Sequence, residues 1–393
     1  MRGMIALVVG MLIVAGCGPA AAPAPAAGGA PAARPGAGSG GAAAGAPVAA
    51  GGQPAASGPA SDPLQALVEA ARQEGELSFS WGDSVLGGSQ EIPKLAERFN
   101  QAYGLNVNVR FTPGLSFPEM AAKLTQEYQA GRRASTDVYI GSDNSVAGLV
   151  RAGTLEPVDW AAWAPNVRNP AQVSANGEAV TFQTWLTGIS YNASRVGPDP
   201  PRSLQDLLKP EYKGRVASTP YGANFDRLAA ADLWGKERTM EFVRAYAGQV
   251  TALVRCSEQN RMIAGEFDVF ALDCNQRGAL SAKARGAPLE FTLASDVPLV
   301  SPVYMAVPKT AAHPAAAKLW INWMLSREGQ ELLYQNDYMD SHLIEGSQTA
   351  KDIQKLEATG VRFTTVGVEW YQAHDEAELD AIREDIQRIL RGQ

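Results

Sequence analysis

The chain has 393 residues and a formal net charge of -7, and no long run of Lys and Arg stands out that could follow a phosphate backbone, so we expect no nucleic-acid partner. Apolar residues make up 46% and charged residues 19% of the chain, which is typical of a water-soluble globular protein. A chain of this length exceeds what one compact core usually holds, and we expect two lobes or domains.

The N-terminal residues have the pattern of a signal peptide. The apolar run 5–15 follows Arg2 and is too short to span a bilayer, which takes about 20 residues. It ends in Val14-Ala15-Gly16-Cys17, where small residues precede a cysteine that can take a diacylglycerol thioether. We expect a lipoprotein signal peptide and lipobox in residues 1–17. The lipid on Cys17 would hold the protein in the cell envelope, at the outer face of the cytoplasmic membrane or in the periplasm. The alternative is a chance cysteine behind an ordinary signal.

Residues 18–60 consist almost entirely of Ala, Gly and Pro. They have no hydrophobic periodicity and cannot bury a core, so we expect a disordered tether. A flexible coil of this length spans on the order of 35 Å. Such a tether would let an anchored domain reach a partner in the membrane.

Helix and strand patterns alternate after the tether. Ser61-Asp62-Pro63 is typical of a helix start, and Gly75 is typical of a helix end. The next expected strands are 77–81, 106–111 and 137–141, and helical periodicity occurs at 92–99, 120–128 and 146–150. This order predicts a mainly parallel sheet with helices on both faces.

A similar pattern restarts after a less regular stretch at 160–179. Strands are expected at 189–192, 215–218, 251–255, 267–273 and 289–293, with helices between them. These elements predict a second α/β lobe. A strand at 300–307, a helix at 313–325 and a mostly helical segment from residue 347 complete the chain.

A series of local patterns keeps a regular order from residue 64 to residue 333. They are VEAARQEGEL at 68–77, GISYN at 188–192, LQDLL at 204–208, YKGRV at 212–216, RMIAGE at 261–266, HPAAAK at 313–318 and SREGQ at 326–330. Together they resemble the periplasmic solute-binding proteins of bacterial ABC importers. The resemblance is closest to the group that includes ferric-iron, polyamine and thiamine binders.

The resemblance implies a two-lobed α/β fold with a ligand cleft between the lobes. The first lobe would combine residues 61–185 and 300–393, and the second lobe would be 186–299. Closure of the lobes on a small solute would present the loaded form to an ABC permease in the membrane. We expect a monomer with this role.

Loops after the carboxyl ends of predicted strands are the expected ligand positions, since open α/β sheets bind ligands there. Trp81 can stack on a flat or cationic ligand. Asp83 and Ser84 follow it, and Asp143 and Asn144 follow a later strand. All four of these polar residues fit turn or capping roles equally well.

The remaining candidates lie on the crossing segments and in the second lobe. Trp185 and Tyr191 lie at the first crossing, where an aromatic side chain also fits a core position. Tyr221 and Asn224 belong to a loop that leads into a helix, whose free amide groups can bind an anion. Asp273 ends another predicted strand. Tyr304, on the returning strand, is a weaker candidate for ligand contact.

The carboxylates and aromatic faces of these loops suit an amine or a quaternary ammonium group. No Lys or Arg is prominent among the loops, so we favour a small polar solute with a cationic part. Ferric iron is the main rival, because the resembled group includes iron binders. Those proteins commonly use an adjacent pair of tyrosines as ligands, and this sequence has no Tyr-Tyr pair.

Cys256 and Cys274 are the two cysteines other than Cys17. An even pair in an oxidising compartment favours a disulfide. Each cysteine follows a predicted strand, as if on neighbouring parallel strands about 4.8 Å apart. We expect a disulfide, and the alternative is two buried thiols.

Familiar catalytic motifs are missing from the sequence, which has no G-x-S-x-G, no H-E-x-x-H and no phosphate loop. His313, His342 and His374 are the only histidines, and none has evident partners for a triad or a metal site. We therefore expect that the protein is not an enzyme and that it has no cofactor and no metal centre. A lipoprotein sensor or assembly factor with the same fold, and an envelope hydrolase, remain as alternatives.

Overall fold

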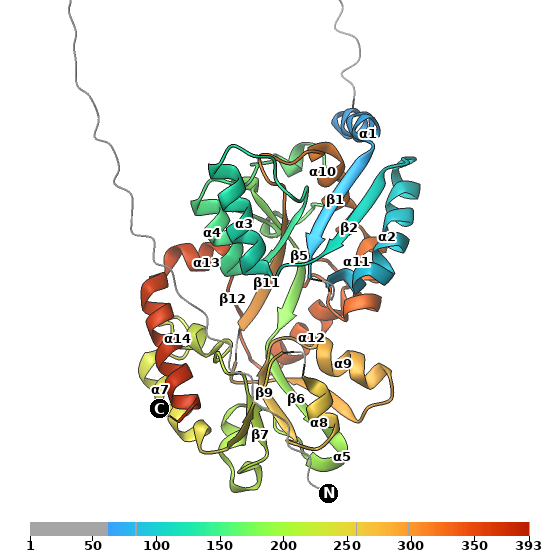
Figure 1. Ribbon diagram of the computed structural model, residues 1–393. Coiled ribbons are helices and arrows are strands. Elements are labelled where there is room, and N and C mark those ends of the chain that lie inside the picture. The colour runs from blue at the N-terminus through green and yellow to red at the C-terminus, as the bar shows by residue number, and fades with distance from the viewer. Residues whose placement is uncertain (1–61, 83–84, 257, 298, 393) are drawn as a thin grey trace, which may run out of the picture. The chain divides into compact units, whose positions relative to one another are not determined.

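The computed structural model describes residues 62–82, 85–256, 258–297 and 299–392 (Figure 1). The predicted signal peptide, Cys17 and the predicted tether lie outside these residues. Asp83 and Ser84 also lie outside them, so these two candidate ligand residues have no structural description.

The first lobe alternates strands and helices from its first residues. Its elements are α1 (Pro63–Glu74), β1 (Glu76–Trp81), α2 (Gly88–Tyr103), β2 (Asn108–Pro113), α3 (Phe117–Gln129), β3 (Tyr139–Ser142), α4 (Asp143–Arg151), β4 (Val173–Ser174) and β5 (Ala179–Leu186). Local signals set the ends of α1 as the sequence predicts. The Asp62 carboxylate accepts the Leu64 N–H at 3.0 Å, and Gly75 ends the helix with a φ of 67°.

The second lobe begins after a single residue, Thr187. Its elements are β6 (Gly188–Asn192), α5 (Ala193–Val196), β7 (Val216–Ser218), α6 (Phe225–Leu228), α7 (Lys236–Ala247), β8 (Val250–Leu253), α8 (Gln259–Ile263), β9 (Val269–Asp273), α9 (Arg277–Ala284) and β10 (Leu289–Leu293).

The chain then returns to the first lobe. The remaining elements are β11 (Leu299–Ala306), α10 (Pro314–Met324), α11 (Arg327–Asp337), α12 (Gln348–Glu357), β12 (Thr364–Thr365), α13 (Val368–Ala373) and α14 (Glu376–Leu390). The last helix does not stay with the first lobe, to which the sequence analysis assigns the whole segment 300–393. α14 packs against α6 and α7 of the second lobe, and Figure 1 shows it beside α7.

The sheets of both lobes are mixed, which corrects the prediction of a mainly parallel sheet. In the first lobe β1 pairs with β2 in parallel, but β11 runs antiparallel to β3 and to β5. In the second lobe β7 is parallel to β8 and β9, whereas β6 is antiparallel to β9 and β10. Of the longer strands, β11 in the first lobe and β6 in the second run against their neighbours, and each follows a crossing between the lobes.

β5 is a strand that the sequence analysis does not predict. Seven of its eight residues are buried, so both faces of the strand are covered, including the face that carries polar Thr181 and Gln183. Its polar side chains are held by the segment after α11. The Thr184 hydroxyl lies 2.7 Å from His342 Nδ1, and the Thr184 N–H donates to the Asp340 carbonyl at 3.1 Å.

The first lobe has an aromatic core around the fully buried Trp320 of α10. Its ring centroid lies 4.7 Å from that of Phe79, 5.3 Å from that of Phe99 and 5.3 Å from that of Trp323. Close aromatic pairs of this kind contribute stability beyond the area they bury. None of the helices in the described ranges combines the length and the apolar character that crossing a membrane requires.

The predicted disulfide is confirmed, although the geometric argument for it was wrong. Cys256 and Cys274 are bonded, with their Cα atoms 5.6 Å apart. The strands β8 and β9 that precede them are not neighbours, because both pair with β7, which lies between them. β7 ends at Ser218, and the loops after its two neighbours meet beyond that end. In the chain-entropy model, a disulfide that closes so short a loop stabilises the fold by about 3 kcal/mol.

Candidate functional site

A cavity of about 760 Å³ lies between the two lobes. From the first lobe, residues just past the carboxyl ends of β1, β2 and β3 line it, namely Gly82, Gly114, Ser116, Phe117 and Asn144. From the second lobe, residues past the carboxyl ends of β7, β8 and β9 line it, namely Tyr221, Asn224, Cys256, Cys274 and Asn275. The strand ends of both lobes therefore face one cavity, as expected for a ligand site in an α/β fold.

Two aromatic side chains form one wall of the cavity. The rings of Trp185 and Phe117 stack with centroids 5.9 Å apart. The Nε1–H of Trp185 is buried and has no hydrogen-bond partner in the described chain. A buried donor without a partner costs free energy, so an acceptor atom in the cavity would be favourable here.

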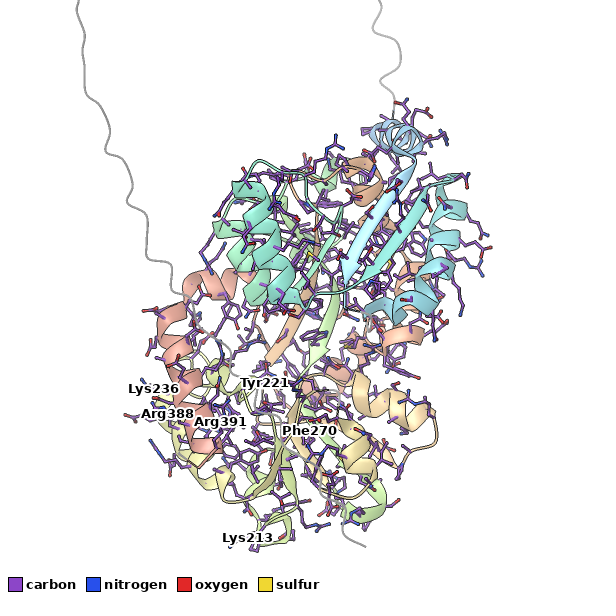
Figure 2. All side chains as sticks on the ribbon, viewed as in Figure 1. Lys213, Tyr221, Lys236, Phe270, Arg388 and Arg391 are labelled. Atoms are coloured by element: carbon purple, nitrogen blue, oxygen red, sulfur yellow. A yellow bond between two sulfur atoms is a disulfide. The ribbon has the colours of Figure 1, made fainter. Side chains whose placement is uncertain are left out.

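Tyr221 forms part of the opposite wall, together with the disulfide. Its hydroxyl lies 2.6 Å from Cys256 Sγ and 3.8 Å from Cys274 Sγ. Figure 2 labels Tyr221 on the second lobe, on the side that faces the first lobe. Tyr221 is 37% exposed and lines the cavity, so the disulfide contacts a side chain of the site.

Arg227 of α6 is a cavity residue that bonds to groups of the first lobe. Its guanidinium donates to the Asp143 carboxylate at 3.0 Å, to the Ser301 hydroxyl at 2.6 Å and to the Tyr371 hydroxyl at 3.0 Å. Asp143 itself is fully buried behind it. Burial raises the pKa of the Asp143 carboxyl, and the charge of Arg227 opposes that rise.

Arg277 and Asp337 form a second ion pair across the cavity. Arg277 is the first residue of α9 in the second lobe, and Asp337 is the last residue of α11 in the first lobe. Arg277 Nη2 lies 3.3 Å from Asp337 Oδ1, a contact that does not meet hydrogen-bond geometry. Asp337 Oδ2 accepts the Leu86 N–H at 3.0 Å. Burial raises the pKa of Asp337, against the opposing effects of Arg277, of this N–H, and of the Gln183 side chain and the Gly87 N–H.

A third arginine, Arg383 of α14, also lines the cavity. Its guanidinium donates to the buried Asp226 carboxylate from Nη2 at 2.6 Å and from Nε at 3.1 Å, and it also bonds to Asp380. The sequence analysis misses all three arginines. Arg227 and Arg277 each lie in the first turn of a helix that follows a loop at a strand end. This position was a usable signal for a residue of the ligand site. Arg383 reaches the cavity only because α14 packs on the second lobe, and no local pattern indicates that.

Four of the predicted site residues line the cavity, namely Asn144, Trp185, Tyr221 and Asn224. The others that the structure describes do not. Trp81 lies in the core of the first lobe, 1% exposed, and its Nε1–H donates to the Val138 carbonyl at 3.1 Å. It is the last residue of β1 and points inward, so the residue after it, Gly82, is the one that reaches the cavity.

The remaining candidates are also structural in their contacts. Tyr191 is partly buried against the core around α7 and β7. Tyr304 is 1% exposed and its hydroxyl accepts the Val368 N–H at 3.2 Å, which fixes the start of α13. Asp143 contacts the cavity only through Arg227.

Asp273 ends β9 but points into the second lobe, where it is 1% exposed. Its carboxylate accepts the Ser190 hydroxyl at 2.5 Å and lies 3.4 Å from Gln259 Nε2. Burial raises the pKa of Asp273 to about 7, although both hydrogen bonds lower it. The Asp273 carboxyl is therefore a buried group that titrates near neutral pH.

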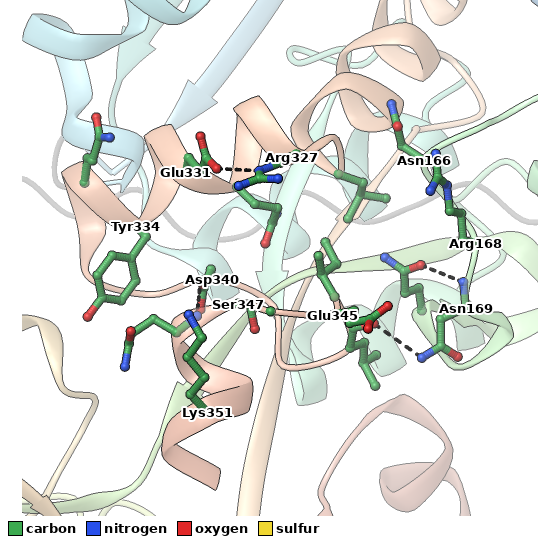
Figure 3. A pocket seen from close by; sticks show the side chains of 18 residues that line it. Asn166, Arg168, Asn169, Arg327, Glu331, Tyr334, Asp340, Glu345, Ser347 and Lys351 are labelled. Atoms are coloured by element: carbon green, nitrogen blue, oxygen red, sulfur yellow. Dashed lines mark hydrogen bonds and ion pairs between the residues drawn. The ribbon is translucent and has the colours of Figure 1, made fainter. Parts of the chain in front are cut away.

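A larger hollow of about 960 Å³ lies on the first lobe, around the end of α11 and the start of α12 (Figure 3). Three of its charged side chains, Asp340, Arg327 and Glu331, have partners among the residues that line it. Asp340 accepts the N–H groups of Gln348 and Thr349 at 2.7 and 2.8 Å, and Arg327 bonds to Glu331 at 2.8 Å. All of its walls belong to one lobe, so lobe closure cannot enclose a ligand there. The cavity between the lobes is therefore the candidate ligand site.

The described residues contain no cluster of three or more His, Cys, Asp or Glu side chains that could hold a metal ion. Two tyrosines, Tyr221 and Tyr371, line the cavity, but their hydroxyl groups contact Cys256 and Arg227 respectively.

Comparison with known proteins agrees with the fold. Residues 135–355 match the family of bacterial extracellular solute-binding proteins. The chain belongs to this family, and it is a solute-binding protein of the ABC-transporter type.

The similar proteins have different ligands in their names. The Fe(3+)-binding periplasmic protein of Serratia marcescens is 26% identical over 256 residues, which cover 63% of this chain and 73% of that protein. The spermidine/putrescine-binding periplasmic protein 1 of Haemophilus influenzae is 24% identical over 284 residues, covering 68% and 75%.

Solved structures show the same fold. Iron-bound HitA from Pseudomonas aeruginosa superimposes with a TM-score of 0.62 at 20% identity and covers 79% of this chain and 99% of that one. The periplasmic binding protein AfuA from Actinobacillus pleuropneumoniae, with fructose-6-phosphate bound, has a TM-score of 0.59 at 19% identity, with 80% and 98% covered. The predicted two-lobed α/β fold is confirmed.

The raised pKa of Asp273 predicts a specific pH dependence of stability. Between about pH 4 and pH 7 the folded state holds a proton that the unfolded state releases, so the free energy of unfolding falls as the pH rises through this range. Asp273→Asn should remove this loss, which is on the order of a few kcal/mol. Both proteins are unfolded with urea at pH 4.5 and pH 8. The free energy of unfolding of the variant, relative to that of the wild type, is expected to be higher at pH 8 than at pH 4.5.

Asp385→Asn, on the exposed face of α14, is the matched control and should follow the wild type at both pH values. Equal pH dependence of Asp273→Asn and wild type would show that the Asp273 carboxyl does not titrate in this range.

Proposed function

We propose that this chain captures a small polar solute with a cationic part in the cavity between the lobes. It delivers the solute to an ABC permease without chemical turnover. Lipid on Cys17 holds it in the cell envelope, at the outer face of the cytoplasmic membrane or in the periplasm. We further propose that the lobes divide near Thr187 and near residue 299, and that the protein acts as a monomer.

The main support for a cationic group in the solute is the state of the Asp337 carboxylate. It is 2% exposed, it lines the cavity, and its Oδ1 accepts no hydrogen bond from the described residues. A buried carboxylate oxygen without a hydrogen bond is costly, and an ammonium group would supply the missing donor.

The aromatic side chains favour the same chemistry. Trp185, Phe117, Tyr221 and Tyr371 all line the cavity, and aromatic faces attract cations. Two of the three arginines are already engaged, because Arg227 makes three hydrogen bonds and Arg383 bonds to two carboxylates. These two are poorly suited to recruit a purely anionic solute, since each would have to leave a buried partner.

Calorimetric titration of the full chain, purified in detergent, tests the ligand class. The compounds are spermidine, putrescine, thiamine, amino acids, ferric citrate and phosphonates. A compound with an amine or quaternary ammonium group is expected to bind. Asp337→Asn should weaken that compound about ten- to hundredfold, the usual range for a hydrogen bond to a charged group.

Glu331→Gln is the matched control, since Glu331 lies on α11 with Asp337 but on its exposed side. It should bind like the wild type. Binding of purely anionic or uncharged compounds alone, unaffected by Asp337→Asn, would contradict the proposed cationic part.

The anchor is tested separately, by fractionating cells that produce the wild type or Cys17→Ala. The wild type should stay with the membranes and carry a lipid adduct at Cys17, and the variant should lose both the adduct and the retention. The sequence basis for this anchor is the apolar run that ends in Val14-Ala15-Gly16-Cys17. Unchanged retention of the variant, with no lipid on the native protein, would contradict the anchor.

A further inference from the structure

The ion pair between Arg277 and Asp337 differs from the other two charged pairs of the cavity. Arg227 and Arg383 each make several hydrogen bonds to the groups around them. Within the described chain, the guanidinium of Arg277 is paired with Asp337 alone, at 3.3 Å and without hydrogen-bond geometry. Asp143 Oδ2 also lacks a partner, but Asp143 does not line the cavity, so Arg277 and Asp337 are the lining charges with unused hydrogen-bonding capacity.

The two charges come from different lobes and meet inside the cavity. The Asp337 side chain is 3% exposed and that of Arg277 is 28% exposed. A purely cationic solute that bound Asp337 would leave Arg277 without a partner and close to a like charge. Leaving a partly buried charge unpaired is costly, so a lone ammonium group is a poor replacement for Arg277.

Two neighbouring features favour an anionic group on the Arg277 side. Arg277 is the first residue of α9, and the N-terminus of a helix stabilises a negative charge. The Nε1–H of Trp185, which lines the same cavity, has no hydrogen-bond partner in the described chain, and a carboxylate oxygen that reached it would supply an acceptor.

We propose that the solute is a zwitterion whose ammonium group binds Asp337 and whose carboxylate binds Arg277, so that it replaces the direct ion pair between them. This inference rests on the proposed function and adds an anionic half to the solute. Both protein charges keep a partner when the solute enters, and the solute itself bridges the two lobes. Arg277 is then the residue that distinguishes a zwitterion from an amine.

The test is a thermal-shift screen of the full chain, in detergent, with the standard L-amino acids, glycine betaine, spermidine and putrescine. The tightest zwitterion is then titrated beside its decarboxylated amine and its deaminated acid. The zwitterion is expected to bind at least tenfold more tightly than either analogue, because each analogue leaves one protein charge unpaired.

Two variants assign the halves of the solute to the two charges. Arg277→Gln should weaken the zwitterion about ten- to hundredfold and bind the amine more tightly than the wild type does, because the competing cation is gone. Asp337→Asn should weaken the zwitterion similarly and bind the acid more tightly than the wild type does, because the competing carboxylate is gone. Arg285→Gln, just past the other end of α9, is the control for Arg277 and should bind as the wild type does. Arg277 is part-exposed, so its variant can be judged even if Asp337→Asn melts early.

The outcomes separate this inference from the proposed function. If an amine binds as tightly as any zwitterion and Arg277→Gln has no effect, the inference is wrong and the cationic solute stands. The same holds if spermidine or putrescine binds and no zwitterion does. If purely anionic compounds alone bind, or no compound binds, both the inference and the proposed ligand class are wrong.

Discussion

Arg227 connects the two lobes through a charge that cannot remain unpaired. Its guanidinium comes from α6 of the second lobe and bonds to Asp143 of α4, Ser301 of β11 and Tyr371 of α13. Its side chain is 13% exposed and that of Asp143 is 0% exposed. Removing one partner of such a pair would leave a buried charge unpaired and lower the free energy of unfolding by about 3–5 kcal/mol. The position of α6 against the first lobe follows from this requirement.

The Arg227 interaction also sets the geometry of the ligand cavity. The loop that carries Tyr221 and Asn224 leads directly into α6, so its position relative to the first lobe depends on Arg227. On the same side, α14 packs on α6, where Arg383 holds Asp226. Farther across the cavity, the only charged link that we find between the described lobes is the looser pair of Arg277 and Asp337. The firm contact and the loose contact therefore lie at different parts of one cavity, and the loose one is where a solute can enter with least loss.

Much of the fold was predictable because local sequence patterns determine many of its elements. The helix caps at Asp62 and Gly75, the strand at 77–81 and the restart of α/β alternation after residue 188 depend on neighbours in sequence, and the family resemblance orders them. β5 was missed although apolar Val180 and Phe182 alternate with polar Thr181 and Gln183, which was a usable local signal. The reversed strands each follow a lobe crossing, and strand direction has no local signal.

The site was less predictable, because it depends on which side a strand-end residue faces and on distant packing. Trp81 and Asp273 end their strands as expected, yet each points into a core, and adjacent residues reach the cavity instead. Asp337, at the end of a helix far along the chain, lines the cavity because it packs beside Leu86. The disulfide was predicted from the cysteine count and compartment, while the strand order that brings its sulfur atoms together was not.

A crystal structure of the protein with the tightest-binding solute would test the central claim directly. The solute should occupy the cavity between the lobes, with its cationic nitrogen about 3 Å from Asp337 Oδ1 and the aromatic ring of Trp185 beside it. A solute found in the hollow near α12, or a cavity in which the Asp337 carboxylate does not touch the solute, would contradict this account.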